Sequence, residues 1–62
     1  MEDRHVLEEL ANVVSNYPLF AGDTISHPRA AECERRGWIK RDKGGDWIPT
    51  ARGIAVHEQV SA

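Results

Sequence analysis

Seven basic side chains are concentrated between residues 29 and 52 of this 62-residue chain, where they outnumber four acidic ones and leave a net charge of +3. They are Arg29, Arg35, Arg36, Lys40, Arg41, Lys43 and Arg52. Lysine and arginine side chains bind phosphate oxygens, and arginine also pairs with the edge of guanine. The segment therefore predicts a nucleic-acid-binding surface.

The charge of the rest of the chain favours a second interpretation of the same residues. Residues 1–28 carry five acids and one base, and the whole chain has a net charge of −2, whereas a domain devoted to nucleic acid is usually basic overall. Glu32 also stands four residues before Arg36, a spacing that forms ion pairs along one face of a helix. The basic residues thus fit either a phosphate-binding surface or an ordinary solvated face, and both interpretations stay open.

Metal binding and catalysis find little support in the residue pattern. The soft metal ligands lack the short spacings of zinc sites; they are His5, His27, Cys33 and His57. Gly44-Gly45 is not followed by the Gly-Lys-Ser/Thr of a phosphate loop, and so short a chain has few residues with which to wall a pocket. We expect no metal, no cofactor and no enzymatic activity.

The basic residues must be positioned by a helix, a hairpin and a further helix. Ser26 and Pro28 suit the start of a helix over 27–36, and Gly37 suits its end, because glycine adopts the left-handed conformation without a steric penalty. Gly44-Gly45 then predicts a tight hairpin turn.

The hairpin is flanked by two tryptophans. Trp38 precedes the turn and Trp47 follows it, so the spacing predicts that at least one of them packs in the core. Pro49 should end the returning strand because it lacks an N–H donor. Thr50 is then placed to cap a last helix that begins at Ala51.

The N-terminal part of the chain predicts one amphipathic helix. Asp3 is a suitable cap, and the residue before Pro18 disfavours helical geometry, so we expect the helix to end near Asn16. Leu19 and Phe20 should then plug one end of the core, and Ile25 is a candidate for a short third strand. The predicted core consists of Val6, Leu7, Leu10, Val14, Leu19, Phe20, Ala30, Cys33, Trp38, Ile39 or Ile48, and Ile54.

The residue order after position 25 resembles the end of a winged-helix domain. The resemblance covers residues 25–58 and rests on Gly37-Trp38-Ile39, a charged stretch with Gly44-Gly45, and Trp47-Ile48-Pro49-Thr50-Ala51-Arg52-Gly53. In that family a recognition helix leads into Gly, an aromatic residue or Leu, and Ile. A charged wing and a Leu-Thr-x-x-Gly turn follow. Pro49 stands where the family usually has Leu, and residues 17–22 leave no room for the full second helix of a helix-turn-helix.

This resemblance implies an α+β fold, a mini winged helix with three helices and a two-stranded hairpin between the second and third. The chain would form one domain over 1–62. The implied function is a small DNA-binding or transcription-regulatory protein of bacterial or phage origin. Its helix at 27–36 would face the major groove of double-stranded DNA, and its wing at 38–48 would contact the backbone or minor groove.

A protein-interaction module is the alternative, for example a phage or mobile-element accessory protein that binds no nucleic acid. Its contact surface would combine an exposed tryptophan with an acidic face formed by Glu2, Asp3, Glu8 and Glu9. A lone cysteine, Cys33, favours a reducing, cytoplasmic setting, and no apolar run is long enough to predict a membrane span. The oligomeric state stays open, with a dimer as one option, because a domain of this size buries only about 60% of its unfolded surface.

Overall fold

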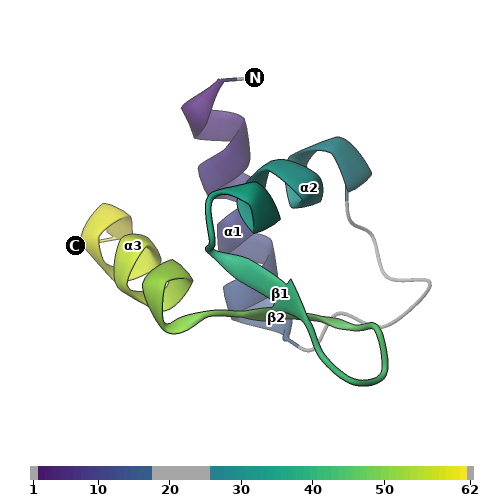
Figure 1. Ribbon diagram of the computed structural model, residues 1–62. Helices are drawn as coiled ribbons and strands as arrows, with labels where there is room; N and C mark the ends of the chain where they lie inside the picture. Colours follow the sequence, from purple (N-terminus) through teal and green to yellow (C-terminus); the bar gives the residue numbers. More distant parts are fainter. Residues whose placement is uncertain (1, 18–25, 62) are drawn as a thin grey trace.

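The computed structural model describes residues 2–17 and 26–61 of the chain. These residues form three helices and one antiparallel hairpin in the arrangement of a small winged helix, with the hairpin between the second and third helices (Figure 1). The elements are α1 (Asp3–Asn16), α2 (His27–Arg35), β1 (Ile39–Arg41), β2 (Trp47–Pro49) and α3 (Ala51–Ser61). The predicted α+β fold is therefore confirmed. The predicted plug of Leu19 and Phe20 and the third strand at Ile25 lie outside the described residues.

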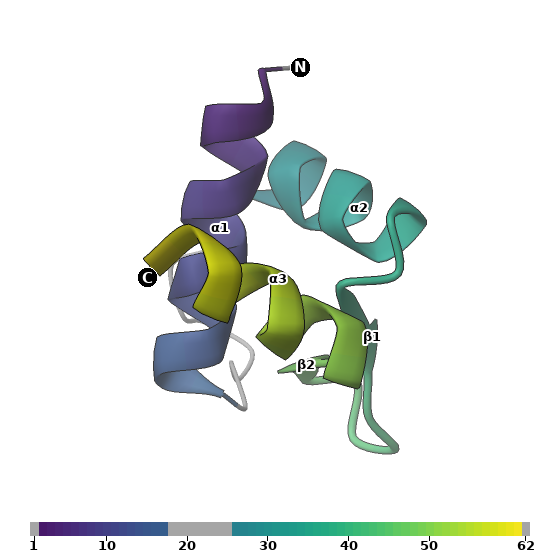
Figure 2. The same ribbon diagram turned by 90° about the vertical axis from the view of Figure 1, so that its left-hand side faces the viewer.

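Helix α1 is the central element of the core, because it contacts α2, α3 and β2 (Figure 2). Val6, Leu10 and Val13 are fully buried along one of its faces, at the spacing of an amphipathic helix. Val14 and Leu7 are only partly buried at the edge of this stripe. The predicted core thus included Val14, which only packs against its edge, and omitted Val13, which is fully buried.

The start of α1 also differs from the prediction. Glu2 occupies the capping position, and its side chain makes no capping hydrogen bond. Asp3 is the first helical residue, and its carboxylate accepts a hydrogen bond at 2.9 Å from Arg36, the residue that follows α2. Asp3 therefore joins α1 to α2 and does not cap α1.

Helix α2 adds Ala30 and Cys33 to the core. The Cys33 thiol donates a hydrogen bond to the backbone carbonyl of Val6 at 3.3 Å. Burial, reinforced by the nearby charge of Glu9, raises the pKa of the Cys33 thiol to about 11. At neutral pH Cys33 is thus a protonated packing residue, as its position on the apolar side of the helix predicted.

The start of α2 is held by a buried carboxylate. Ser26 occupies the N-cap position, as predicted, but its side chain makes no capping hydrogen bond. Its backbone N–H instead donates to Glu9 Oε1 at 3.3 Å. Glu9 was predicted on the acidic surface, yet it is buried, and it also accepts a hydrogen bond from Asn12 at 3.0 Å.

The end of α2 is the stop that the sequence predicted at Gly37. Gly37 has a φ of 78°, the left-handed region in which glycine carries no steric penalty. The N–H of Trp38 donates to the carbonyl of Cys33 at 3.0 Å, and the N–H of Gly37 to that of Glu34 at 2.9 Å. These two bonds form a Schellman motif, which satisfies the last carbonyls of the helix and directs the chain into β1.

The hairpin packs one face against α1. Ile39 pairs with Pro49, and Arg41 pairs with Trp47, so these four residues share a face of the sheet. Ile39 and Trp47 are buried there, with Trp47 only 6% exposed. Of the predicted alternatives, Ile39 is therefore the core residue.

Two predicted core residues are not part of the fully buried core. Trp38 is only partly buried, because it lies in the turn between α2 and β1 and not in a strand. Ile54 lies on the exposed side of α3, so its assignment to the core was wrong. The tryptophan that the core needs is Trp47.

The hairpin turn depends on an aspartate as well as a glycine. Gly45 has a φ of 84°, whereas Gly44 does not adopt a positive φ. Asp42 Oδ1 accepts hydrogen bonds from the backbone N–H groups of Gly44 and Asp46, at 2.9 and 3.0 Å. The turn is therefore an Asx-type turn, and the sequence analysis missed the role of Asp42.

Helix α3 begins with a capping threonine, as predicted. Thr50 Oγ1 accepts from the N–H of Gly53 at 3.0 Å and donates to the carbonyl of Gly37 at 2.6 Å. The N–H of Thr50 donates to the carbonyl of Trp38 at 2.9 Å. These bonds join the first turn of α3 to the end of α2.

Within the described residues, no helix has the length and apolar character needed to cross a membrane.

Candidate nucleic-acid interface

The three predicted arginines of α2 and its end all form ion pairs. Arg36 donates to Glu32 at 2.8 Å and to Asp3 at 2.9 Å. Arg35 Nε donates to Glu32 at 3.0 Å, and Arg29 lies 3.9 Å from Glu8 of α1. The ordinary ion-pair interpretation therefore describes this helix, and the predicted pair of Glu32 with Arg36 is confirmed.

Glu32 is the centre of this cluster. Hydrogen bonds from Arg35 and then from Arg36 lower the pKa of the Glu32 carboxyl from 4.5 to about 2. The folded protein therefore holds Glu32 ionised at a pH at which the unfolded chain would protonate it. A carboxyl whose pKa is depressed on folding stabilises the protein above its unfolded pKa, and this stabilisation is lost as pH falls toward the folded pKa.

Replacing Glu32 with glutamine should accordingly destabilise the protein at neutral pH. We expect the difference in melting temperature between wild type and Glu32→Gln to be constant above pH 4.5 and to shrink toward zero as the pH approaches about 2. Circular dichroism melts across this range measure it. The exposed Glu34 makes the matched control, since Glu34→Gln removes the same charge from the same helix. An equal pH dependence in both variants would contradict the role of Glu32.

The remaining four predicted residues are not neutralised in this way. Lys40, Lys43 and Arg52 form no ion pair or hydrogen bond through their side chains with any residue that the structure describes. Lys40 is exposed on β1, Lys43 is exposed in the hairpin turn, and Arg52 is exposed in the first turn of α3. The structure thus divides the predicted site into a paired group on α2 and an unpaired group on the hairpin and α3.

Arg41 stabilises the hairpin itself. Its guanidinium carbon lies 4.2 Å from the centroid of the Trp47 ring, within the range of a cation–π contact. Its Nη1 donates to the carbonyl of Gly45 at 3.1 Å. No described carboxylate neutralises Arg41, so its positive charge is not cancelled by an ion pair within the described residues.

The acidic surface predicted for a protein-interaction module is not formed as expected. Glu9 is buried, and Asp3 is paired with Arg36. Glu2 and Glu8 remain exposed. Trp47 is buried beneath Arg41, while Trp38 is partly buried with the Arg36 guanidinium 5.2 Å from its ring centroid.

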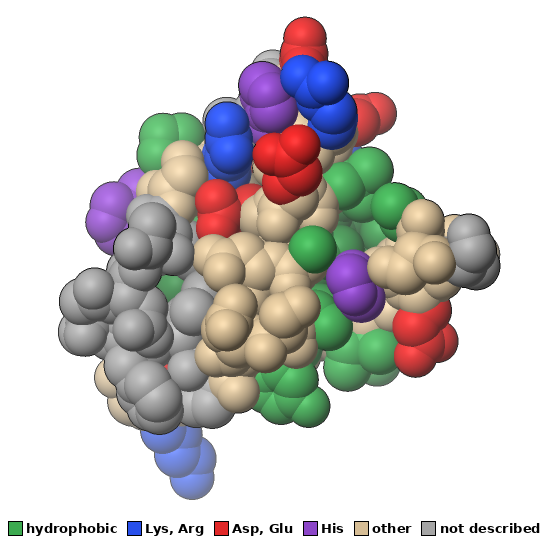
Figure 3. All heavy atoms as spheres, turned by 180° about the vertical axis from the view of Figure 1, so that it is seen from behind, with side chains coloured by type: hydrophobic (Ala, Val, Ile, Leu, Met, Phe, Trp, Pro, Cys, Tyr) green, Lys and Arg blue, Asp and Glu red, His purple; other side chains and the backbone are tan. Residues whose placement is uncertain are grey.

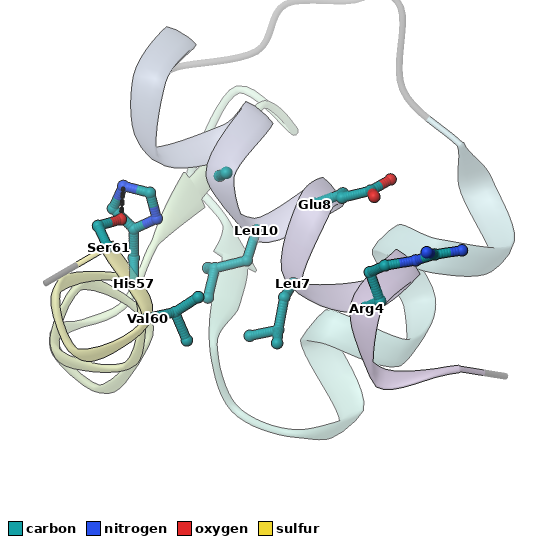
Figure 4. Close-up of a pocket in the computed structure, with 8 residues that line it drawn as sticks. Arg4, Leu7, Glu8, Leu10, His57, Val60 and Ser61 are labelled. Carbon is teal, nitrogen blue, oxygen red and sulfur yellow. Dashed lines mark hydrogen bonds between the residues drawn. The ribbon is translucent and has the colours of Figure 1, made fainter.

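A groove between α1 and α3 is a further surface feature, and the sequence analysis did not predict it. Its volume is about 390 Å³. Leu7, Leu10 and Val60 form its apolar walls, and their side chains face the space between the two helices (Figure 4). The remaining lining residues are Arg4, Glu8, Ala11, His57 and Ser61. The i, i+4 pair Val56 and Val60 was a signal for an apolar face on α3, but only the packing shows that Val60 stays outside the core.

The described residues thus define a small α+β protein of winged-helix-like arrangement, with basic side chains on its wing. No family model matches this chain, and no curated protein or solved structure matches it. Within the part of the chain that the structure describes, no three metal-ligating side chains are grouped.

Proposed function

We propose that the protein binds double-stranded DNA through its hairpin and the start of α3, as a small regulatory protein. The observation that carries this proposal is the contrast between the two basic groups. Arg29, Arg35 and Arg36 have carboxylate partners, whereas Lys40, Lys43 and Arg52 have none among the described residues. A cation without a partner binds phosphate without first losing an ion pair.

The anchoring of the hairpin supports this role. Trp47 is buried against the core, and Asp42 accepts two backbone hydrogen bonds in the turn. The three cations between Lys40 and Lys43 are therefore carried on an element of defined shape. A positioned cation loses less conformational freedom on binding than one on a disordered loop.

Helix α2 would make the secondary contact in this proposal. The Arg35 side chain is 71% exposed despite its pair with Glu32. Binding a phosphate would cost Arg35 its pair with Glu32, which Arg36 would still neutralise. This assignment differs from the sequence-based one, in which α2 made the principal contact.

The proposal concerns a binding protein without enzymatic activity or cofactor, and it places the protein in the cytoplasm. The lone thiol of Cys33 supports a reducing compartment. The wing cations have no carboxylate partner among the described residues, which supports binding of an anionic polymer. A reducing compartment and an anionic partner both agree with the resemblance of residues 25–58 to the winged-helix family.

Fluorescence anisotropy with a mixed-sequence DNA duplex, at several salt concentrations, tests this function. The triple variant Lys40→Gln/Lys43→Gln/Arg52→Gln should bind roughly ten- to a hundredfold more weakly at low salt. Its slope of log affinity against log salt should fall by about 0.9 for each phosphate that the variant no longer neutralises. Circular dichroism should show the same fold for the variant, because these three side chains form no ion pair or hydrogen bond with a described residue.

The matched control lowers the net charge by three elsewhere on the surface. Arg4→Gln/Arg29→Gln/Gln59→Glu has the same net charge as the wing variant but retains the hairpin cations, Arg52 and Arg35. We expect it to keep most of the affinity and of the salt slope. Equal losses in the two variants would mean that only net charge matters, and a wild-type protein that does not bind at low salt would end the DNA proposal.

A further inference from the structure

Helix α3 leaves most of its apolar side chains exposed or only partly buried. Of its residues, all of which the structure describes, only Gly53 is buried. Val60 is 58% exposed, and Val56 is only partly buried. Helices in small proteins are stabilised mainly by burying an apolar stripe. The apolar side of α3 next to α1 is therefore incompletely covered within the described part of the chain.

This uncovered surface continues onto α1. Leu7 and Ala11 stand one turn apart on α1, are partly buried and both line the groove. Hydrophobic side chains are visible between α1 and α3 when the molecule is seen from behind (Figure 3). The groove of about 390 Å³ thus combines a hollow beside α1 with the projecting Val60 of α3.

Both signs of charge lie at the rim of the groove. Arg4 and Glu8 stand one turn apart on α1, and both side chains extend away from the apolar walls (Figure 4). Their pairs within the chain are long and exposed, at 3.7 Å from Arg4 to Glu2 and 3.9 Å from Glu8 to Arg29. Such pairs contribute little, so both groups can form other pairs at little energetic cost.

We propose that a second copy of this chain covers the groove, in a two-fold symmetric dimer with the two α1 helices antiparallel. A two-fold interface uses the same patch on both subunits, so the patch must complement itself. Here the projecting Val60 complements the hollow beside Leu7. Antiparallel α1 helices bring Arg4 of each copy toward Glu8 of the other, which makes the charges complementary. A partner whose contact surface carried charges of only one sign would be repelled either by Arg4 or by Glu8.

Sedimentation equilibrium without DNA tests the dimer, over protein concentrations from about 1 μM to about 1 mM. We expect wild type to show a reversible monomer–dimer equilibrium in this range. Val60→Glu should weaken it by at least about tenfold, because the interface would then bury a charge. Gln59→Glu adds the same charge at the neighbouring exposed position, outside the groove lining, and should leave the equilibrium unchanged. A wild-type protein that stays monomeric up to about 1 mM would overturn the proposal.

A charge exchange tests the antiparallel arrangement. Arg4→Glu puts glutamates at both rim positions, and Glu8→Arg puts arginines at both, so each variant alone should dimerise about tenfold more weakly than wild type. An equimolar mixture of the two should recover dimerisation, because the mixed dimer has an opposite charge at every contact. A mixture that associates no better than its components would overturn this arrangement. None of these variants touches the hairpin, so the outcome is independent of DNA binding.

Discussion

Gly53→Ala is expected to destabilise the protein by about 3 kcal/mol or more, which is enough to unfold much of the population. A β carbon at position 53 would stand 1.9 Å from the carbonyl oxygen of Trp38 and 2.8 Å from its carbonyl carbon. Both are backbone atoms, so no side-chain rotation relieves the clash. Helix α3 would have to move away, breaking the hydrogen bond from Thr50 N–H to the Trp38 carbonyl.

The sign of this effect distinguishes packing from helix propensity. Alanine is favoured over glycine in a helix interior by about 1 kcal/mol, so propensity alone predicts that Gly53→Ala stabilises the protein. Urea denaturation followed by circular dichroism measures the difference. Gly44→Ala is the control, since a β carbon there would meet only two aspartate side-chain oxygens, at 3.4 and 3.5 Å, and should change stability by less than about 1 kcal/mol. A Gly53→Ala protein as stable as wild type would show that α3 is not held in this position.

Trp47→Ala should cost about 3–5 kcal/mol, the usual loss when a buried aromatic side chain is truncated in a core. Trp47 is 6% exposed and joins β2 to α1. Its removal also deprives Arg41 of the ring on which the guanidinium stacks. The hairpin should therefore lose its attachment to the helices, and DNA binding through the hairpin should fall with it.

Trp38→Ala is the comparison that tests this assignment. Trp38 is only partly buried, so its truncation should cost clearly less than that of Trp47. Urea denaturation of both variants and of Trp47→Phe, followed by circular dichroism, measures the order. We expect Trp47→Phe to retain much of the lost stability because it keeps an aromatic ring in the core. A larger loss for Trp38→Ala than for Trp47→Ala would contradict the observed core.

Most of the backbone path could be predicted because its signals are local. Gly37 ends α2 through a conformation that depends on the residue itself, and Thr50 caps α3 through a bond to a residue three positions away. Helical spacing placed Val6 and Leu10 in the core. In contrast, the choice between Val13 and Val14 depends on where α2 and the hairpin cross α1. That information lies in the docking of distant segments and not in the spacing.

The candidate site was less predictable for the same reason. The pair of Glu32 with Arg36 is local and could be predicted, whereas Asp3 meets Arg36 from 33 residues away. The pairing of Arg29 with Glu8 likewise requires α1 and α2 to be packed together. Among the seven cations, the sequence alone therefore indicated a carboxylate partner only for Arg36. Their division into a paired and an unpaired group follows only from the packed structure.

The central position of α1 has a consequence for the newly made chain. Helix α1 is synthesised well before its apolar face can be covered, because β2 and α3 contact it from much later in the sequence. A nascent chain that has reached Arg36 already contains Val6, Leu10 and Val13 but lacks both Ile39 and Trp47. Two helices alone leave this core open, and exposed apolar surface on incomplete chains favours aggregation. Folding therefore awaits synthesis of the hairpin and α3, and translation that stops before them leaves an unfolded product for proteases.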